Sequence, residues 1–247
     1  MEKKLNIWKY SSPKPLFGLI DRCVPWLFVL CAVFGLAGLY VGFFIAPTDF
    51  QQGEVYRIIF IHVPSAWMSM FIYSLMVFWS LAGLIFNTRV SYMMARSLAP
   101  TGALMTTIAL WTGSLWGKPT WGTWWVWDAR LTSELLLLFL YLGYIALGSA
   151  ITDHRRSDRA TAILALVGAA NIPVIYFSVE WWNTLHQGAS ISLTSAPKMA
   201  MSMLAGLILM TLCFWIYSIA AALTRLKLNI LVREKDAAWV KKLESSL

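Results

Sequence analysis

Six long apolar runs are the feature that most constrains the fold of this chain. They lie at about 26–46, 58–86, 97–116, 135–151, 160–179 and 199–223. Each reaches or approaches the roughly 20 residues that a helix needs to cross about 30 Å of hydrocarbon. Because backbone polar groups have no partner in lipid, these runs are expected to be helices. The sequence therefore predicts an all-α integral membrane protein with six transmembrane helices, in a single membrane domain over residues 1–247.

Charge predicts the orientation of these helices. Hydrophobic residues make up 59% of the chain and charged residues 13%, yet sixteen of the twenty Lys and Arg residues fall on one predicted side. The other side holds only Arg57, Lys118, Arg130 and Lys198. By the positive-inside rule, both termini are cytoplasmic, including a tail at about 224–247 that could form a surface helix. The net charge of +8 then reflects topology and anionic membrane lipid. No nucleic-acid-binding module is visible.

A cluster of tryptophans lies between the third and fourth runs. The segment WGKPTWGTWWVWDARLTSE spans 116–134 and contains Trp116, Trp121, Trp124, Trp125 and Trp127. An aromatic belt at the membrane interface explains one or two indoles, but not five within twelve residues. Glycines in the segment let backbone approach a flat object closely, and indoles offer broad rigid faces. The outer loop at about 117–134 is therefore interpreted as a binding platform.

Charged residues follow the last of these indoles. Thr132 or Ser133 is expected to cap a helix, with Glu134 near its positive end. Asp128 and Arg130 could pair with one another at the surface. Arg130 could instead bind a carboxylate, because a guanidinium matches carboxylate geometry.

Two of the three histidines lie on the side of the platform. His154 belongs to the basic run DHRRSDR and is expected in a solvated cytoplasmic loop. His62 lies about one turn into the second run from its outer end, and His186 lies between the fifth and sixth runs. Either one alone is best explained as a hydrogen-bonded structural residue. Together they could bind a metal from two sides.

Haem fits this set of residues better than zinc does. Zinc normally takes three or four protein ligands, and the sequence shows no cluster that would supply them. Haem takes one or two imidazoles, an apolar aromatic wall and cations for its propionates. Arg57 and Arg130 are on the predicted outer side. The cysteines form no C-x-x-C-H motif, so covalent attachment of haem is not indicated.

The stretch WGKPTWGTWWVWDARLTS, with an outer-side histidine on either side of it, resembles the "WWD" signature of haem-handling membrane proteins. Over essentially its whole length, the chain is similar to the cytochrome c maturation protein C family, also called haem exporter protein C. The larger haem lyase subunits share the motif but have more spans and more histidines.

This resemblance implies a role for each candidate residue. His62 and His186 would be the axial ligands of a non-covalent haem b that is a transient cargo. Arg57 and Arg130 would contact the propionates. The platform that touches haem and a partner would consist of Trp116, Trp121, Trp124, Trp125, Trp127 and Asp128.

The resemblance also implies a location and partners. The family presents haem on the periplasmic face of the bacterial inner membrane to a periplasmic haem chaperone, cytochrome c maturation protein E. Further partners would be a small single-span subunit, protein D, and the ABC transporter subunits, proteins A and B. The expected function is haem delivery for c-type cytochrome biogenesis, without catalysis by this chain.

Three other functions are weaker. A membrane enzyme or binding protein could use the Trp loop for a lipid-linked glycan, with Asp128 and Glu134 as acid and base. A coupled transporter is disfavoured, because apart from His62 the six runs contain no Asp, Glu, Lys, Arg or His. A cytochrome that conducts electrons across the bilayer would need a second histidine pair at the inner face, which His154 alone does not supply.

Overall fold

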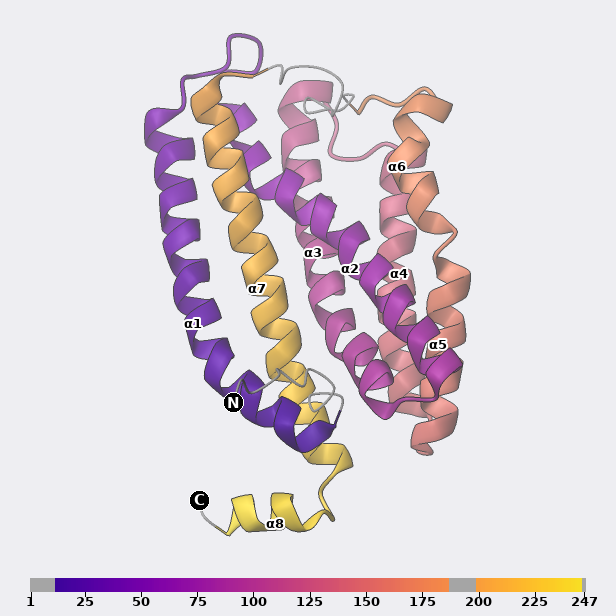
Figure 1. Cartoon of the computed structure of the whole chain (residues 1–247). Helices are drawn as coiled ribbons and strands as arrows, with labels where there is room; N and C mark the ends of the chain where they lie inside the picture. Colours follow the sequence, from indigo (N-terminus) through magenta and orange to yellow (C-terminus); the bar gives the residue numbers. More distant parts are fainter. Residues whose placement is uncertain (1–11, 187–198, 246–247) are drawn as a thin grey trace.

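The computed structural model describes residues 12–186 and 199–245, which form a helical bundle without a β-strand (Figure 1). The first half contains α1 (Pro13–Tyr40), a π-helical turn (Val41–Ile45), a 3-10 turn (Glu54–Ile58), α2 (Ile59–Phe86) and α3 (Arg89–Trp121). The second half contains α4 (Ala129–Ala150), α5 (His154–Gly168), α6 (Asn171–Trp181), α7 (Met201–Arg233) and α8 (Ala238–Glu244). The predicted all-α class is confirmed for the described residues.

Five helical segments are long and apolar enough to cross a membrane. They are 13–45, 54–86, 129–150, 154–181 and 201–233. The expected run at 97–116 lies within α3, which is long enough at 33 residues but less apolar. Its hydroxyl side chains bond to carbonyls one turn back in the same helix, as Ser97 does to Met93 and Thr106 to Gly102. Because α3 packs against α2, α4 and α7 inside the bundle, these residues need not face lipid.

Three central helices position the site. Tyr141 of α4 fills the space beside Gly102 of α3, and its hydroxyl donates a 2.7 Å hydrogen bond to the Ser69 carbonyl of α2. A Cβ at position 102 would lie 2.1 Å from the Tyr141 ring, so a glycine is required for this close approach. The buried contact fixes α2, α3 and α4 relative to one another.

The fifth apolar run is interrupted. α5 ends at Gly168 and α6 begins at Asn171, so 160–179 is two helices joined by a tight turn. The Asn171 side-chain amide donates to the Ser133 carbonyl of α4 over 2.9 Å. This bond satisfies a polar group that the break leaves inside the bundle.

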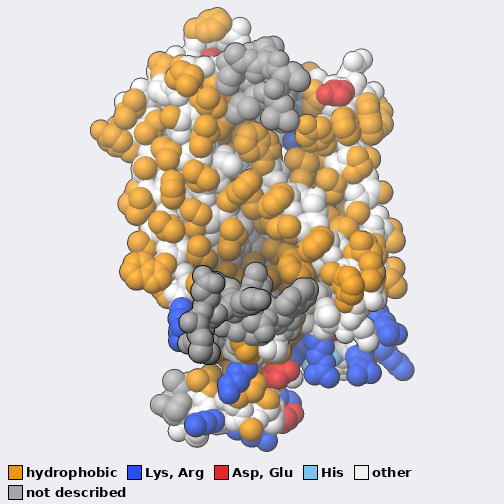
Figure 2. Space-filling model, in the orientation of Figure 1, with side chains coloured by type: hydrophobic (Ala, Val, Ile, Leu, Met, Phe, Trp, Pro, Cys, Tyr) orange, Lys and Arg blue, Asp and Glu red, His pale blue; other side chains and the backbone are white. Residues whose placement is uncertain are grey.

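The two described chain ends lie at the same end of the bundle (Figure 1). Figure 2 shows a flank covered by hydrophobic side chains, with Lys and Arg gathered at the end where the chain starts and finishes. The expected tail at 224–247 begins as helix, because α7 continues to Arg233. The short helix α8 follows, and its Trp239 packs edge-on against Phe17 of α1 with ring centroids 5.5 Å apart.

Candidate functional site: a histidine and tryptophan pocket

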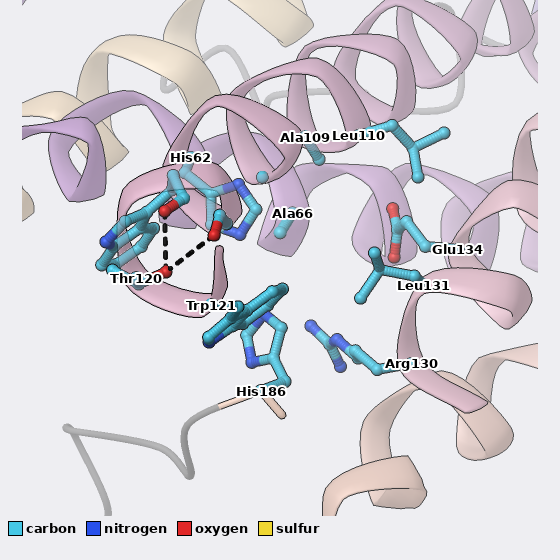
Figure 3. A pocket seen from close by; sticks show the side chains of 13 residues that line it. His62, Ala66, Ala109, Leu110, Thr120, Trp121, Arg130, Leu131, Glu134 and His186 are labelled. Carbon is cyan, nitrogen blue, oxygen red and sulfur yellow. Dashed lines mark hydrogen bonds between the residues drawn. The ribbon is translucent and has the colours of Figure 1, made fainter. Parts of the chain in front are cut away.

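A pocket of about 670 Å³, its open mouth included, lies at the opposite end of the bundle from the termini. Side chains from α2, α3, α4 and the segment after α6 converge on it (Figure 3). They are His62, Ala66, Ala109, Leu110, Gly113, Trp116, Gly117, Thr120, Trp121, Arg130, Leu131, Glu134 and His186.

His62 is held in one orientation by α3. Its Nδ1 lies 3.1 Å from the Thr112 hydroxyl oxygen, and that hydroxyl lies 2.6 Å from the Ile108 carbonyl. Since the hydroxyl donates its hydrogen to the carbonyl, it accepts one from Nδ1. The imidazole then carries its free lone pair on Nε2, the atom available to a metal. The ring is buried, and Gly113 packs against its Cε1 atom.

His186 stands opposite His62. It follows the end of α6 by a short non-helical segment, and the two ring centroids are 6.1 Å apart at an interplanar angle of 32°. Two imidazoles bound to one metal through nitrogens at about 2 Å would have centroids roughly 6 Å apart. The separation therefore fits one metal ion between the two rings.

The five predicted tryptophans divide into two groups. Trp116 and Trp121 line the pocket. Trp116 meets the His62 ring edge-on at 5.6 Å and donates through its indole nitrogen to Gln52 Oε1 over 2.8 Å. Trp121 meets the His186 ring at 6.1 Å.

The other three indoles lie outside this lining. Trp124 and Trp127 are 54% and 77% exposed. Trp125 is partly buried against Trp127, with ring centroids 5.4 Å apart, and its indole nitrogen has no hydrogen-bond partner.

The expected loop at 117–134 is much shorter than the sequence suggested. α3 continues to Trp121 and α4 begins at Ala129, which leaves only 122–128 between the helices. Gly122 ends α3 at φ 79°, a conformation that favours glycine, and its N–H bonds to the Lys118 carbonyl. The predicted platform is therefore divided into two surfaces. One is on the last turns of α3, and the other is on the connection 122–128 that follows.

The prediction of a Thr132 or Ser133 cap is wrong. The N-cap of α4 is Asp128, whose Oδ1 accepts from the Leu131 backbone N–H at 2.8 Å. The Ser133 hydroxyl instead bonds to the Ala129 carbonyl within the helix. An Asp immediately before an apolar helix is the stronger cap, because its carboxylate also favours the helix dipole.

Glu134 is not at the helix end, contrary to expectation. It is buried in the second turn of α4, lines the pocket and accepts a 2.7 Å hydrogen bond from Ser69 of α2. With Asp128 used as a cap and Glu134 enclosed, the carboxylates do not form an accessible pair. This arrangement gives no support to the glycan-processing alternative.

The two predicted arginines have different surroundings. Arg130 lines the pocket; its Nη1 donates to the Ile175 carbonyl at 2.7 Å, and Figure 3 shows its guanidinium beside His186 and Trp121. Arg57 is not among the lining residues. It pairs with Glu54 and donates to the Gly42 and Ala46 carbonyls, where the π-helical turn ends.

Several residues of the site were not predicted. Thr112 orients His62, while Gly113, Gly117 and Thr120 line the pocket. Their spacing contains a signal: positions 113, 116, 117 and 120 recur at three or four residues and so share one face of a helix with Trp116.

The pocket combines two imidazoles, two indoles, one arginine and one buried carboxylate, Glu134, with apolar side chains between them. Within 12–186 and 199–245, no three His, Cys, Asp or Glu side chains gather as a metal site of their own. A ligand that supplies most of its own metal coordination, and takes only axial nitrogens from protein, therefore fits this donor set.

Comparison with known proteins agrees with this chemistry. The family model described as "Heme exporter protein C" matches residues 6–241. The Escherichia coli K12 protein of that name is 46% identical over 96% of this chain and 97% of its own length. The Haemophilus influenzae one is 41% identical over 98% and 100%. A putative cytochrome c biosynthesis ccmC-like mitochondrial protein of Marchantia polymorpha is 49% identical over 62% of this chain and 65% of its own.

The match of the family model extends across helices α1 to α7 and both pocket histidines, and identity above 40% over nearly the whole of both bacterial relatives is well beyond chance similarity. The chain belongs to the Heme exporter protein C family.

Proposed function

We propose that this chain is a haem-binding subunit that presents non-covalent haem b at the periplasmic face and delivers it to the periplasmic haem chaperone, protein E. The observation that carries the proposal is the 6.1 Å separation of the His62 and His186 rings in an aromatic pocket. The names of the relatives support haem export and cytochrome c biogenesis as the setting. The chain acts as a handling subunit and not as an enzyme.

The proposed topology has six spans in a bacterial inner membrane. α3 is the sixth, in addition to the five apolar segments, and α5 with α6 counts as one. Both termini are cytoplasmic, because the Lys and Arg side chains gather at their end of the bundle (Figure 2). The pocket at the other end then faces the periplasm.

Each pocket residue has a distinct task in this proposal. His62 Nε2 and a His186 ring nitrogen bind the haem iron axially, while Trp116 and Trp121 cover part of the ring system. Arg130 is the one predicted arginine placed to bind a propionate, since its guanidinium reaches the pocket and Arg57 is engaged elsewhere. Arg57 instead stabilises the carbonyl end of the first span.

Delivery requires a surface that the chaperone can approach. The exposed indoles Trp124 and Trp127 lie directly after the pocket helix and are suited to this contact. Asp128 contributes by fixing the start of α4 next to them. We assign the single-span protein D and the ABC subunits A and B as further partners on the basis of the family.

The deciding experiment is a visible absorption spectrum of the purified protein, oxidised and reduced, with and without added haem. Wild type is expected to show a strong Soret band and sharp low-spin α and β bands. The double variant His62→Ala/His186→Ala is expected to lose them, because both axial nitrogens are gone.

His154→Ala is the matched control, since this histidine is exposed at the start of α5, far from the pocket. Its spectrum should equal that of wild type. Unchanged haem content in the double variant would overturn the ligand assignment, and a colourless wild type after haem-replete expression would overturn the proposed function.

A further inference from the structure

A second cavity lies in the other half of the bundle, towards the basic end. It encloses about 570 Å³, mouth included, between α3, α4 and α7. The lining residues are Arg96, Pro100, Tyr144, Ile145, Gly148, Ser149, Arg225, Leu228 and Asn229. None of them is acidic, so the cavity is positively charged.

The two arginines come from different helices and reach the cavity at similar depth. Arg96 is seven residues after the start of α3, and Arg225 is eight before the end of α7. At about 1.5 Å per residue, both lie roughly 10–12 Å inside the ends of their helices. Each of these 33-residue helices is about 50 Å long and the hydrocarbon layer is about 30 Å thick, so a centred helix extends roughly 10 Å beyond it at each end. Both residues then lie near the boundary between headgroups and hydrocarbon.

Neither guanidinium is neutralised by a carboxylate in the described part of the chain. Arg96 donates to the Gly148 carbonyl at 3.0 Å and lies 3.5 Å from the Ser157 hydroxyl; Arg225 donates to the Thr101 hydroxyl at 2.6 Å. These partners are neutral and use only some of the five N–H groups of each guanidinium.

Nearby basic residues are treated differently. Arg233, two turns further along α7, forms a bidentate ion pair with the buried Asp158, and Lys227 pairs with Asp21. Arg233 and Lys227 thus have carboxylate partners, whereas no ion pair is formed by Arg96 or Arg225 among the described residues. Two unneutralised charges that face one partly enclosed space favour an anion between them.

The mouth of the cavity is apolar. Leu228 is 57% exposed at its edge, and Pro100 and Ile145 form part of the wall. Asn229 adds a polar side chain to the lining and is itself fixed by donating to the Ser97 hydroxyl at 2.8 Å. A ligand with an anionic head and an apolar body would satisfy both parts of the site.

We infer that this cavity binds the phosphate of an anionic phospholipid from the leaflet at the basic end of the bundle, with Arg96 and Arg225 as the phosphate ligands. Basic pockets between membrane helices on this side suit such headgroups. The acyl chains would leave past Leu228 and lie along the exposed flank of the bundle. The assignment does not depend on the haem site.

The test is native mass spectrometry of the full-length protein in detergent, titrated with dioleoyl phosphatidylglycerol or with dioleoyl phosphatidylcholine. Wild type is expected to bind the anionic lipid about tenfold more tightly than the zwitterionic one. Arg96→Gln/Arg225→Gln is expected to lose this preference. Arg155→Gln/Arg156→Gln, which removes two exposed arginines at the same end, is expected to keep it.

Several outcomes would overturn the inference. A wild type without preference, or equal loss in the Arg155/Arg156 control, would show diffuse surface attraction. Displacement by millimolar inorganic phosphate would show a free-anion site, and displacement by added haem would assign the arginines to propionates. If the glutamine pair does not fold, Arg96→Lys/Arg225→Lys keeps both charges but loses the planar fork, and its undiminished binding would contradict the role given to the guanidiniums.

Discussion

Trp121 and Trp127 lie six residues apart in the sequence but have opposite surroundings. Trp121 belongs to the last turn of α3, lines the pocket and contacts the His186 ring. Trp127 belongs to the connection between α3 and α4 and is 77% exposed. The same residue type therefore forms part of a partly buried pocket wall and of an exposed surface, and the helix end at Gly122 separates the two. Retention of a ligand and its transfer to a partner should be separable by mutation.

The largest expected difference is between a substitution at Trp121, which lines the pocket, and one at Trp127, which is exposed. Trp121→Ala removes an aromatic wall beside His186, so haem affinity should fall by about tenfold or more. Trp127→Ala should leave haem affinity within about twofold of wild type but slow transfer to the chaperone, because exposed aromatic residues are common anchors at interfaces. Haem titration and a stopped-flow transfer assay measure the two effects. Equal loss of affinity in both variants would contradict the division.

A substitution at Arg130 tests how a pocket residue other than tryptophan contributes to haem affinity. Arg130→Lys keeps the charge but loses the planar fork, so haem affinity should fall by about fivefold. The diagnostic measurement uses haem dimethyl ester, which lacks propionate charges. Wild type should prefer haem over the ester, and the Lys variant should lose most of that preference. The matched change Arg57→Lys should preserve it, since Arg57 bonds to Glu54 and backbone carbonyls outside the pocket.

A smaller effect is expected from Gly113→Ala. A Cβ at this position would lie 3.0 Å from His62 Cε1, so the imidazole must shift by a few tenths of an ångström. Haem affinity should fall about two- to threefold, with altered low-spin bands, while Ala itself favours the helix. Gly143→Ala is the control, because its added Cβ would be 3.9 Å from Leu164. A Gly113→Ala spectrum that matched the control would argue against tight positioning of His62.

The sequence predicted the classes of residue in the site better than their positions. His62, Trp116, Trp121, Arg130 and His186 were expected on one side of the membrane, and the structure brings all five to one pocket. Periodic apolar runs and charge asymmetry are properties of long segments. They therefore predict which segments are spans and on which side of the membrane the connections between them lie.

The errors arose where one or two residues decide the geometry. α3 was expected to end near 116 but continues to Trp121, because Pro119 is accommodated within it and Gly122 supplies the left-handed end. Asp128 was interpreted as part of the platform, yet it also caps α4. Arg57 shares a predicted side with Arg130, but no pattern in the sequence revealed the carbonyls that it would contact.

The second cavity was invisible in the sequence for a related reason. Arg96 directly precedes the apolar run 97–116 and Arg225 follows the run 199–223, so both are among the sixteen basic residues predicted on the cytoplasmic side. Both are inside helices in the structure, because α3 and α7 extend well beyond their apolar runs. Only the three-dimensional packing of α3, α4 and α7 brings the two side chains to one space.

The two pocket histidines lie on different kinds of structural element, a long helix and a short non-helical segment. This difference has a kinetic consequence. His62 is buried on the long helix α2 and lies within hydrogen-bond distance of Thr112, whereas His186 lies on a short non-helical segment after α6. A short non-helical segment at a helix end opens locally more readily than the interior of a long helix. We therefore expect the two iron–nitrogen bonds to break in a fixed order, with His186 leaving first. The haem would then be bound to α2 through His62 alone. The iron position that His186 had occupied would be open to another nitrogen ligand.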